Sequence, residues 1–327
     1  MILAGDVGGT KSVLVLFEAA GDGLRQIREE TFRNAEFTSF EAILSKFLHD
    51  ETAFALSVGC FGVAGTVIDG RCRLTNIGWE MEEELLARTT GASRVKLLND
   101  LEAAAYGMLH LSGDELAVLH GGLTPGRKGN VAVIAAGTGL GEAMLLWDGT
   151  RHHPVASEGG HADFAPRTDQ EIALLRYLLP KFGGHVSYER ILSGPGLFNV
   201  YSFLRDTGYA AEPAWLKEKL TEGDSGATVS EIGLAGGHPL CVAALKLFSA
   251  IYGAEAGNLA LKCLAVGGVF VGGGIAPQIL PALENGSFMR GFTDKGRFSD
   301  LMGGMRVSVA LNPRAPLLGA AHYALRL

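Results

Sequence analysis

A strand, a glycine turn and a second strand occur twice in this sequence, and this repeat restricts the fold more than any other feature. The first copy covers residues 1–18 and turns at Gly8 and Gly9. The second starts with the apolar run 131–135 and turns through Gly137-Thr138-Gly139-Leu140-Gly141. Two copies about 130 residues apart predict an internally duplicated α/β architecture, in which each half supplies one glycine turn to a shared site.

The spacing of apolar residues predicts the other main elements. Helical spacing is found over residues 40–48, 81–89, 101–111, 169–179, 194–207, 239–264 and 316–325, and strand-like runs over 56–63, 95–98, 116–119, 266–271 and 305–311. The pattern changes from strand to helix at Asn99-Asp100. Side chains at such a junction commonly point into a binding site.

Length and charge limit the classes of protein to which this chain can belong. A chain of 327 residues that is 47% hydrophobic can fill two cores of ordinary domain size. The net charge is -7 and no run of Lys or Arg occurs, so nucleic acid is not an expected partner. The four cysteines, Cys60, Cys72, Cys241 and Cys263, form no C-x-x-C pair and are interpreted as buried thiols in a reducing compartment.

Residues 263–283 carry no charge and are long enough to cross a bilayer. Three consecutive glycines, Gly272 to Gly274, would leave backbone groups unpaired in lipid, so a buried strand followed by a turn is favoured there. Asp6 interrupts the start of the chain where a signal peptide would be apolar. We therefore expect a soluble, cytoplasmic protein with no membrane partner.

The first turn, Gly5-Asp6-Val7-Gly8-Gly9-Thr10-Lys11, offers a carboxylate, two glycines and a hydroxyl. Its backbone N–H groups are suited to a phosphate, and Asp6 to hydrated Mg²⁺. The alternative is an ordinary hairpin whose glycines adopt positive φ. The pattern fits neither the P-loop nor G-x-G-x-x-G. A second turn at Gly137, Thr138 and Gly139 favours the phosphate hypothesis, because two turns can hold the two ends of one triphosphate.

Three further motifs carry polar groups suited to phosphoryl transfer. Gly272-Gly273-Gly274-Ile275 leaves room for an adenosine on the backbone. Transfer to an alcohol needs a carboxylate as base, for which Asp100 is the candidate, with a helix N-cap as its alternative role. Glu158, His161 and Glu189 match the hydroxyls of a sugar. Their irregular spacing disfavours the alternative, a metal site.

Longer motifs resemble the bacterial glucokinase family. They are Asp6-Val7-Gly8-Gly9-Thr10, Leu98-Asn99-Asp100, Ala136 to Gly141, Glu158-Gly159-Gly160-His161-Ala162-Asp163-Phe164-Ala165-Pro166 and Glu189-Arg190-Ile191-Leu192-Ser193-Gly194-Pro195-Gly196. Shorter matches are Leu74-Thr75-Asn76 with Trp79, Gly257-Asn258-Leu259-Ala260-Leu261, Gly272 to Pro277, Asp294 to Phe298 and Leu317 to Ala321. The resemblance extends nearly from end to end.

This resemblance implies a fold. It is the two-domain actin-like ATPase (ribonuclease H-like) fold of the hexokinases, with a mixed five-stranded sheet in each domain and a cleft between them. Residues 1–110 and 314–327 would form the smaller α/β domain, and residues 111–313 the larger.

The resemblance also implies the site. Asn99, Glu158, His161 and Glu189 would hydrogen-bond D-glucose, and Asp100 would be the base for its 6-hydroxyl. Gly8, Gly9, Thr10, Gly137, Thr138 and Gly139 would contact the phosphates of ATP. Gly273 and Gly274 would lie against the adenosine, and Asp6 would hold Mg²⁺ through water.

Two residues depart from the family pattern without removing a proposed catalytic group. Lys11 replaces a common Asn, and is expected either to contact a phosphate oxygen or to be solvated. Thr66 replaces a common Pro. The separate repressor/open-reading-frame/kinase (ROK) branch begins similarly but carries a cysteine-rich zinc motif, which this sequence lacks.

The function predicted from the resemblance is glucokinase: ATP-dependent phosphorylation of glucose at the 6-hydroxyl, the first step of glycolysis. The alternatives are a kinase for another hexose, such as mannose or glucosamine, and a sugar-sensing relative without activity. A regulator would be expected to carry a DNA-binding segment before Asp6 or to lack Asp100. The family resemblance also implies a homodimer.

Overall fold

The computed structural model describes residues 1–21, 23–49, 55–74, 76–124 and 126–327. Thr75, from the Leu74-Thr75-Asn76 motif, therefore lies outside the described residues. Contacts divide the chain into two compact units. Unit 1 is Met1–Gly113, Pro154–Ala156 and Asn312–Leu327, and unit 2 is Asp114–His153 and Ser157–Leu311. The domain boundaries predicted from the sequence stay a prediction, because a unit defined by contacts is not by itself a domain that folds alone.

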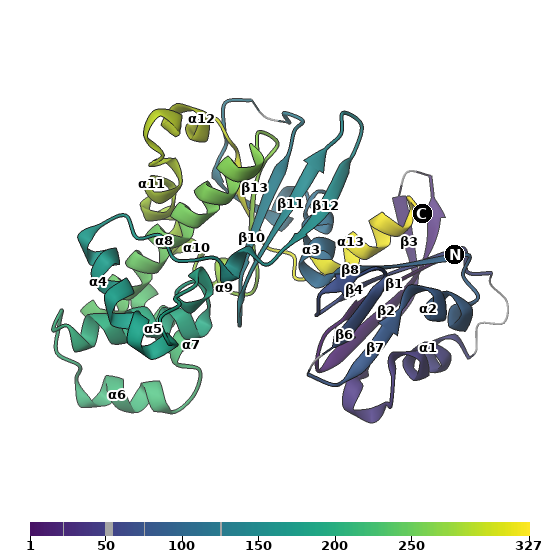
Figure 1. Cartoon of the computed structure of the whole chain (residues 1–327), viewed down its shortest axis with the longest axis horizontal. Helices are drawn as coiled ribbons and strands as arrows, with labels where there is room; N and C mark the ends of the chain where they lie inside the picture. The colour runs from purple at the N-terminus through teal and green to yellow at the C-terminus, as the bar shows by residue number, and fades with distance from the viewer. Residues whose placement is uncertain (22, 50–54, 75, 125) are drawn as a thin grey trace. The chain divides into compact units, whose positions relative to one another are not determined.

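Unit 1 is built on a five-stranded mixed sheet in the order β3-β2-β1-β4-β8 (Figure 1). Its strands are β1 Ile2–Val7, β2 Lys11–Ala20, β3 Gly23–Arg33, β4 Val58–Val63 and β8 Arg94–Asn99. β1 pairs with β2 antiparallel and with β4 parallel, and β8 continues the parallel part. A separate small sheet holds β5 Val67–Ile68, β6 Arg71–Leu74 and β7 Trp79–Glu82. The carboxyl ends of β1, β4 and β8 therefore share one sheet edge.

Helices cover both faces of the unit 1 sheet through two hydrophobic cores. One core includes Phe40 and Phe47 of α1 (Phe40–Leu48) and Leu86 of α2 (Glu83–Thr90). The other joins α3 (Asp100–Met108) and α13 (Ala315–Ala324) to the opposite face. α3 and α13 approach so closely that a Cβ on Gly319 would lie 1.7 Å from the carbonyl oxygen of Ala103. The C-terminal segment is thus an integral part of the N-terminal unit.

The second sheet has six strands in the order β12-β11-β10-β13-β14-β9, so the prediction of five strands is wrong for this sheet. Its residues belong to unit 2 except Pro154–Ala156 of β12. The strands are β9 Leu116–His120, β10 Val131–Ala136, β11 Leu140–Trp147, β12 His152–Ser157, β13 Gly268–Gly272 and β14 Val307–Ala310. The strand that the apolar pattern did not predict is β12. Asp148 accepts hydrogen bonds from the N–H groups of Thr150 and Arg151, and this turn brings the chain back beside β11.

The helices of unit 2 surround one apolar core, in which α8 is the longest helix. They are α4 Asp169–Leu178, α5 Gly194–Asp206, α6 Ala214–Thr221, α7 Ser225–Leu234, α8 Pro239–Cys263, α9 Ile275–Gln278, α10 Leu280–Glu284, α11 Ser287–Thr293 and α12 Ser299–Gly303. Short 3-10 helices lie at Gly113–Glu115, Gly159–His161, Leu179–Phe182, Tyr188–Arg190 and Gly296–Phe298, and in unit 1 at Asn34–Glu36.

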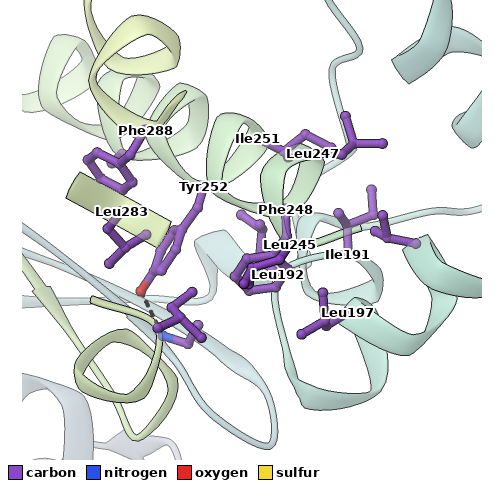
Figure 2. Close-up of a cluster of buried hydrophobic side chains, with 14 of the residues drawn as sticks. Ile191, Leu192, Leu197, Leu245, Leu247, Phe248, Ile251, Tyr252, Leu283 and Phe288 are labelled. Carbon is purple, nitrogen blue, oxygen red and sulfur yellow. Dashed lines mark hydrogen bonds between the residues drawn. The ribbon is translucent and has the colours of Figure 1, made fainter. Parts of the chain in front are cut away.

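α8 is long and apolar enough to span a membrane, but 78% of its apolar window is buried within the protein. Figure 2 shows Leu245, Phe248 and Tyr252 of α8 among side chains of other elements, where they form the core. The charge-free run 263–283 contains β13 followed by a turn, as predicted. All four cysteines are free and buried, which confirms their interpretation as buried thiols.

Candidate active site

The first glycine turn connects β1 to β2 in unit 1. The N–H of Gly8 donates to the carbonyl of Lys11 at 3.0 Å, which closes the hairpin. Neither Gly8 nor Gly9 has positive φ, so the alternative that explained these glycines by backbone conformation is wrong. A Cβ on Gly9 would lie 3.4 Å from Nδ2 of Asn76. Thr10 and Lys11 are exposed. The turn presents an open backbone with a hydroxyl beside it, as a phosphate requires.

Asn34 anchors this turn, and the sequence analysis did not find it. The side chain is 2% exposed. Its Nδ2 donates to the carbonyl of Gly8 at 2.8 Å, and its Oδ1 accepts from the Ser12 hydroxyl at 2.8 Å. The backbone N–H of Asn34 donates to the carbonyl of Thr10 at 3.0 Å. One buried residue therefore fixes three points along residues 8–12.

Asp6 lies in β1 between Gly62 of β4 and Val13 of β2. Burial raises the pKa of its carboxyl group, the nearby Asp100 raises it further, and Lys11 opposes the shift. Two carboxylates close together at the end of a parallel strand create a site of negative potential. Hard cations such as Mg²⁺ prefer carboxylate and water oxygens, so the donor set fits this ion.

Asn99 and Asp100 lie where β8 ends and α3 begins. The N-cap of α3 is Asn99, and Asp100 is the first residue of the helix. Asn99 Oδ1 accepts from the N–H of Leu101 at 2.9 Å, and Glu102 closes a capping box by accepting from the N–H of Asn99. The alternative of Asp100 as N-cap is therefore wrong. The pattern Asn99-x-x-Glu102 is a signal in the sequence from which this cap could have been found.

The second glycine turn connects β10 to β11 in unit 2. The N–H of Gly137 donates to the carbonyl of Gly139 at 2.8 Å, and the N–H of Gly194 donates to the carbonyl of Gly137 at 2.9 Å. Glu189 Oε2 accepts from the N–H of Leu140 at 3.0 Å. A Cβ on Gly139 would lie only 2.5 Å from this oxygen. The turn and the carboxylate of Glu189 therefore hold one another in place.

His161 and Glu189 come together in unit 2 through two short segments, the first of which also carries Glu158. A 3-10 turn over Gly159–His161 follows Glu158, and the N–H of Tyr188 donates to the carbonyl of Ala162 at 3.0 Å. His161 Nδ1 lies 4.0 Å from Oε1 of Glu189, and the His161 side chain is 59% exposed. Among the described residues, no group of three or more His, Cys, Asp or Glu side chains is arranged to hold a metal ion.

A cavity of about 560 Å³ in unit 2 is lined by Gly137, Thr138 and Gly274. The N-termini of α5 and α7 complete its wall. Pro195 of α5 belongs to the motif that begins at Glu189, whereas Asp224 and Ser225 were missed in the sequence analysis because no local motif marks them. Helix N-termini favour anionic groups. A larger cavity of about 700 Å³ elsewhere in the unit is lined by none of the predicted site residues.

Gly273 does not line the cavity beside Gly274, although both were predicted to contact adenosine. Its φ is +80°, and a Cβ there would lie 2.2 Å from the carbonyl oxygen of Ala136. The residue therefore allows the turn after β13 to pass against the end of β10.

Comparison with known proteins places this arrangement in a family. The family model described as Glucokinase matches residues 3–327. A glucokinase from Synechocystis sp. is 42% identical over 98% of this chain and 96% of its own length. This chain belongs to the glucokinase family. A glucokinase from Nostoc punctiforme is 40% identical over 100% of the chain and 99% of its own length.

Solved structures support the same fold. A glucokinase from an Antarctic psychrotroph matches 100% of this glucokinase-family chain and 99% of its own, with a TM-score of 0.88 and 29% identity. A ROK-family glucokinase from Streptomyces griseus, in complex with glucose and AMPPNP, has a TM-score of 0.62 and 23% identity over 100% of this chain and 99% of its own, which shows the fold alone. The predictions of the glucokinase family, the actin-like fold and a glucokinase enzyme are confirmed.

Proposed function

We propose that this chain transfers the γ-phosphoryl group of ATP to the 6-hydroxyl of D-glucose. The observation that carries the proposal is the β8–α3 junction in a glucokinase-family chain. Because Asn99 caps α3, Asp100 is not needed as the cap. Its carboxyl group is near enough to Asp6 to raise the pKa of that residue. A carboxylate at this position is suited to accept a proton in phosphoryl transfer.

The sugar is held by Asn99, Glu158, His161 and Glu189. Each offers acceptors or donors that match sugar hydroxyls. Asn99 uses one N–H for the carbonyl of Gly65 at 3.1 Å and retains a second. Glu189 uses Oε2 for the N–H of Leu140, which leaves its other oxygen directed near His161. A carboxylate already fixed by a backbone group, as that of Glu189 is, costs less entropy to order when the sugar binds.

The nucleotide binds in the cavity of about 560 Å³ bounded by Thr138 and Gly274. The turn at Gly137, Thr138 and Gly139, and the turn at Gly8, Gly9 and Thr10, bind phosphate oxygens through backbone N–H groups and hydroxyls. Asp6 would hold Mg²⁺ through water. When bound, this ion offsets negative charge on the phosphates.

In the reaction, Asp100 accepts the proton of the glucose 6-hydroxyl as its oxygen bonds to the γ-phosphorus. The bond from the γ-phosphorus to the bridging oxygen breaks, and the electron pair leaves with ADP. Asp100 later releases its proton to solvent. The products are glucose 6-phosphate, ADP and one proton.

The proposal extends to the assembly and the compartment. The family resemblance implies a homodimer, which sedimentation equilibrium would detect as twice the chain mass. A cytoplasmic location is supported by four buried, unpaired cysteines and by the burial of α8 in the core.

A coupled assay of glucose 6-phosphate formation tests the proposal. The purified protein is given Mg-ATP with glucose, mannose, glucosamine or no sugar, and ADP and polyphosphate are tried in place of ATP. We expect saturable turnover that depends on sugar and is greatest for glucose with ATP. Greater kcat/KM for another hexose would assign a different substrate, and no turnover with any hexose would favour a sensing role.

A further inference from the structure

Two glutamates meet in the core of unit 2, beneath the segment that carries Glu158 and His161. Glu142 of β11 is 1% exposed and Glu255 of α8 is 0% exposed. The charge of Glu255 and a hydrogen bond with its side chain both raise the pKa of Glu142, so the two carboxyl groups are neighbours. In each residue Oε1 is buried and accepts no hydrogen bond within the described part of the chain, although Lys262 forms an ion pair with Oε1 of Glu255. Two ionised carboxylates have no hydrogen to share, so the contact requires a proton on one of them.

Few positive charges face the pair. Lys262 Nζ, 3.6 Å from Glu255 Oε1, belongs to a side chain that is 54% exposed. Lys295 Nζ donates instead to Asn258 Oδ1 at 2.6 Å and to the carbonyl of Ala254 at 2.9 Å. Burial, followed by the charge of Glu255, raises the pKa of Glu142 to about 8, and Lys262 opposes this. The phenol groups of Tyr188 and Tyr252 also face the pair and stay protonated, because burial raises both pKa values. The charge of Glu255 and a hydrogen bond with it raise the pKa of Tyr188 further.

The pair contacts both segments that carry the sugar-binding residues. Oε2 of Glu142 lies so close to Gly159 that a Cβ there would be 2.1 Å away. Glu255 Oε2 accepts from Asn258 Nδ2 at 2.8 Å, and the same Nδ2 lies 3.1 Å from the hydroxyl of Tyr188. Gly159 directly follows Glu158, and Tyr188 directly precedes Glu189. The two carboxyl groups and Asn258 thus support both segments from below.

We infer that Glu142 and Glu255 share one proton and act as positioning residues for Glu158, His161 and Glu189, so that loss of this proton weakens sugar binding. The inference rests on the proposed function, since it concerns the same site. With the proton present, the pair is compact and carries one charge. Without it, two buried charges repel at contact distance, and Glu142 cannot move toward Gly159 without displacing that backbone.

The first experiment measures KM for glucose and for Mg-ATP between pH 6 and pH 9.5. For the wild type we expect KM for glucose to rise by about tenfold from pH 7 to pH 9, because one proton must be retained for tight binding. Glu142→Gln keeps the shape of the protonated acid, so its KM for glucose should stay flat. Its kcat at pH 7 and its KM for Mg-ATP should match the wild type.

Lys262→Met is a graded control. Lys262 lowers the pKa of Glu142, so its removal should move the rise in KM to higher pH. A flat wild-type profile, or a rise that persists unchanged in Glu142→Gln, would overturn the inference. The second outcome would assign the titration to another group, such as Lys295, whose pKa burial lowers to about 8.

Infrared spectroscopy of the ligand-free protein tests the shared proton without any assay of activity. The wild type should show a carboxylic-acid C=O band at pH 7 that disappears by pH 9.5 and is absent from Glu142→Gln. Without that band in the wild type the inference fails, while the proposed function stands if glucose is phosphorylated. A wild type that shows the band but phosphorylates no hexose overturns the proposed function instead.

Discussion

The two glycine turns occupy equivalent positions in two sheets, and they are held by different means. Each follows a strand that has a parallel neighbour on one side and its antiparallel partner on the other: β1 with β4 and β2, and β10 with β13 and β11. The same backbone frame therefore surrounds the glycine turn in both units. This shared frame is what the repeat in the sequence encodes.

The side chains around the turns differ. In unit 1 the last residue pair of the hairpin is Val7 with Ser12, and it encloses residues 8–11. In unit 2 the last pair is Ala136 with Leu140, and it encloses residues 137–139. The position of Asp6, one pair earlier, is taken by Ala135 in unit 2. Asn34 holds the first turn, whereas Glu189 holds the second. We infer that unit 1 supplies the carboxylates Asp6 and Asp100 for the reaction. In unit 2, Glu189 links the phosphate-binding turn to the sugar-binding residues.

Replacement of Asp100 by Ala should produce the largest effect. We expect kcat to fall by about 10³-fold, the typical contribution of a general base, while KM for glucose changes by less than about tenfold. Asp100→Asn, which keeps the shape but not the basicity, should lose as much turnover. The coupled glucose 6-phosphate assay measures both constants. Full activity in either variant would show that another group accepts the proton of the 6-hydroxyl.

Gly139→Ala should break the contact between the second glycine turn and the carboxylate of Glu189. Its methyl group would occupy the place of Glu189 Oε2, so we expect KM for glucose to rise by about tenfold through loss of one fixed, charge-assisted contact. Gly137→Ala is the matched control, because a Cβ there meets nothing within 4 Å. It should alter KM for Mg-ATP rather than for glucose. Equal effects of the two variants on glucose would contradict a separate role for Glu189.

Asn34→Ala should loosen the first turn. It leaves the carbonyl of Gly8 and the hydroxyl of Ser12 without a buried partner, so we expect the free energy of unfolding to fall by about 2 kcal/mol and KM for Mg-ATP to rise. Urea denaturation and steady-state kinetics provide the two measurements. Ser12→Ala removes only one of these bonds and should cost less. An Asn34→Ala protein with unchanged KM for Mg-ATP would limit this residue to stability.

The smallest expected effect is a loss of stability at low pH, and it arises beside α3, the helix that carries Asp100. His110, two residues after the end of α3, stacks on His322 of α13 with ring centroids 3.7 Å apart. Burial, then the charges of His322 and Arg326, lowers the pKa of His110 to about 4. The unfolded chain therefore binds a proton first as pH falls, and stability should be lost between about pH 6.5 and pH 4. Thermal unfolding of wild type and His110→Gln over this range should show a weaker pH dependence in the variant.

Elements with a strong local pattern could be predicted from the sequence. Residues 40–48 have apolar residues at helical spacing, and α1 is Phe40–Leu48. The strands around both glycine turns were equally clear. β3 was not predicted, because Gly23–Arg33 is rich in charged residues and becomes a strand by pairing with β2. Its formation depends on a neighbour rather than on its own composition.

Part of the site could be found only from the structure. Asn34 contacts residues 8–12, and Glu142 contacts Gly159 and Glu255, at sequence separations that no local motif records. The nucleotide-sized cavity also joins α5, α7 and the turn after β13. By contrast, Asp6, Asp100, Glu158 and Glu189 each lie in a compact motif. The residues with proposed chemical roles were visible in the sequence, and those that position them were not.

The packing of α13 against α3 also bears on how the chain folds during synthesis. β1, β4 and β8 belong to the first third of the sequence, but the apolar face formed by residues such as Ala4, Cys60 and Leu98 is covered by α13. Domains generally fold as they emerge from the ribosome, at about 5–20 residues per second. Unit 1 must therefore wait, with this face incomplete, until residues 312–327 have been made. Unit 2 has all its strands and helices before then, so the second part of the chain to be synthesised is the first that can finish folding.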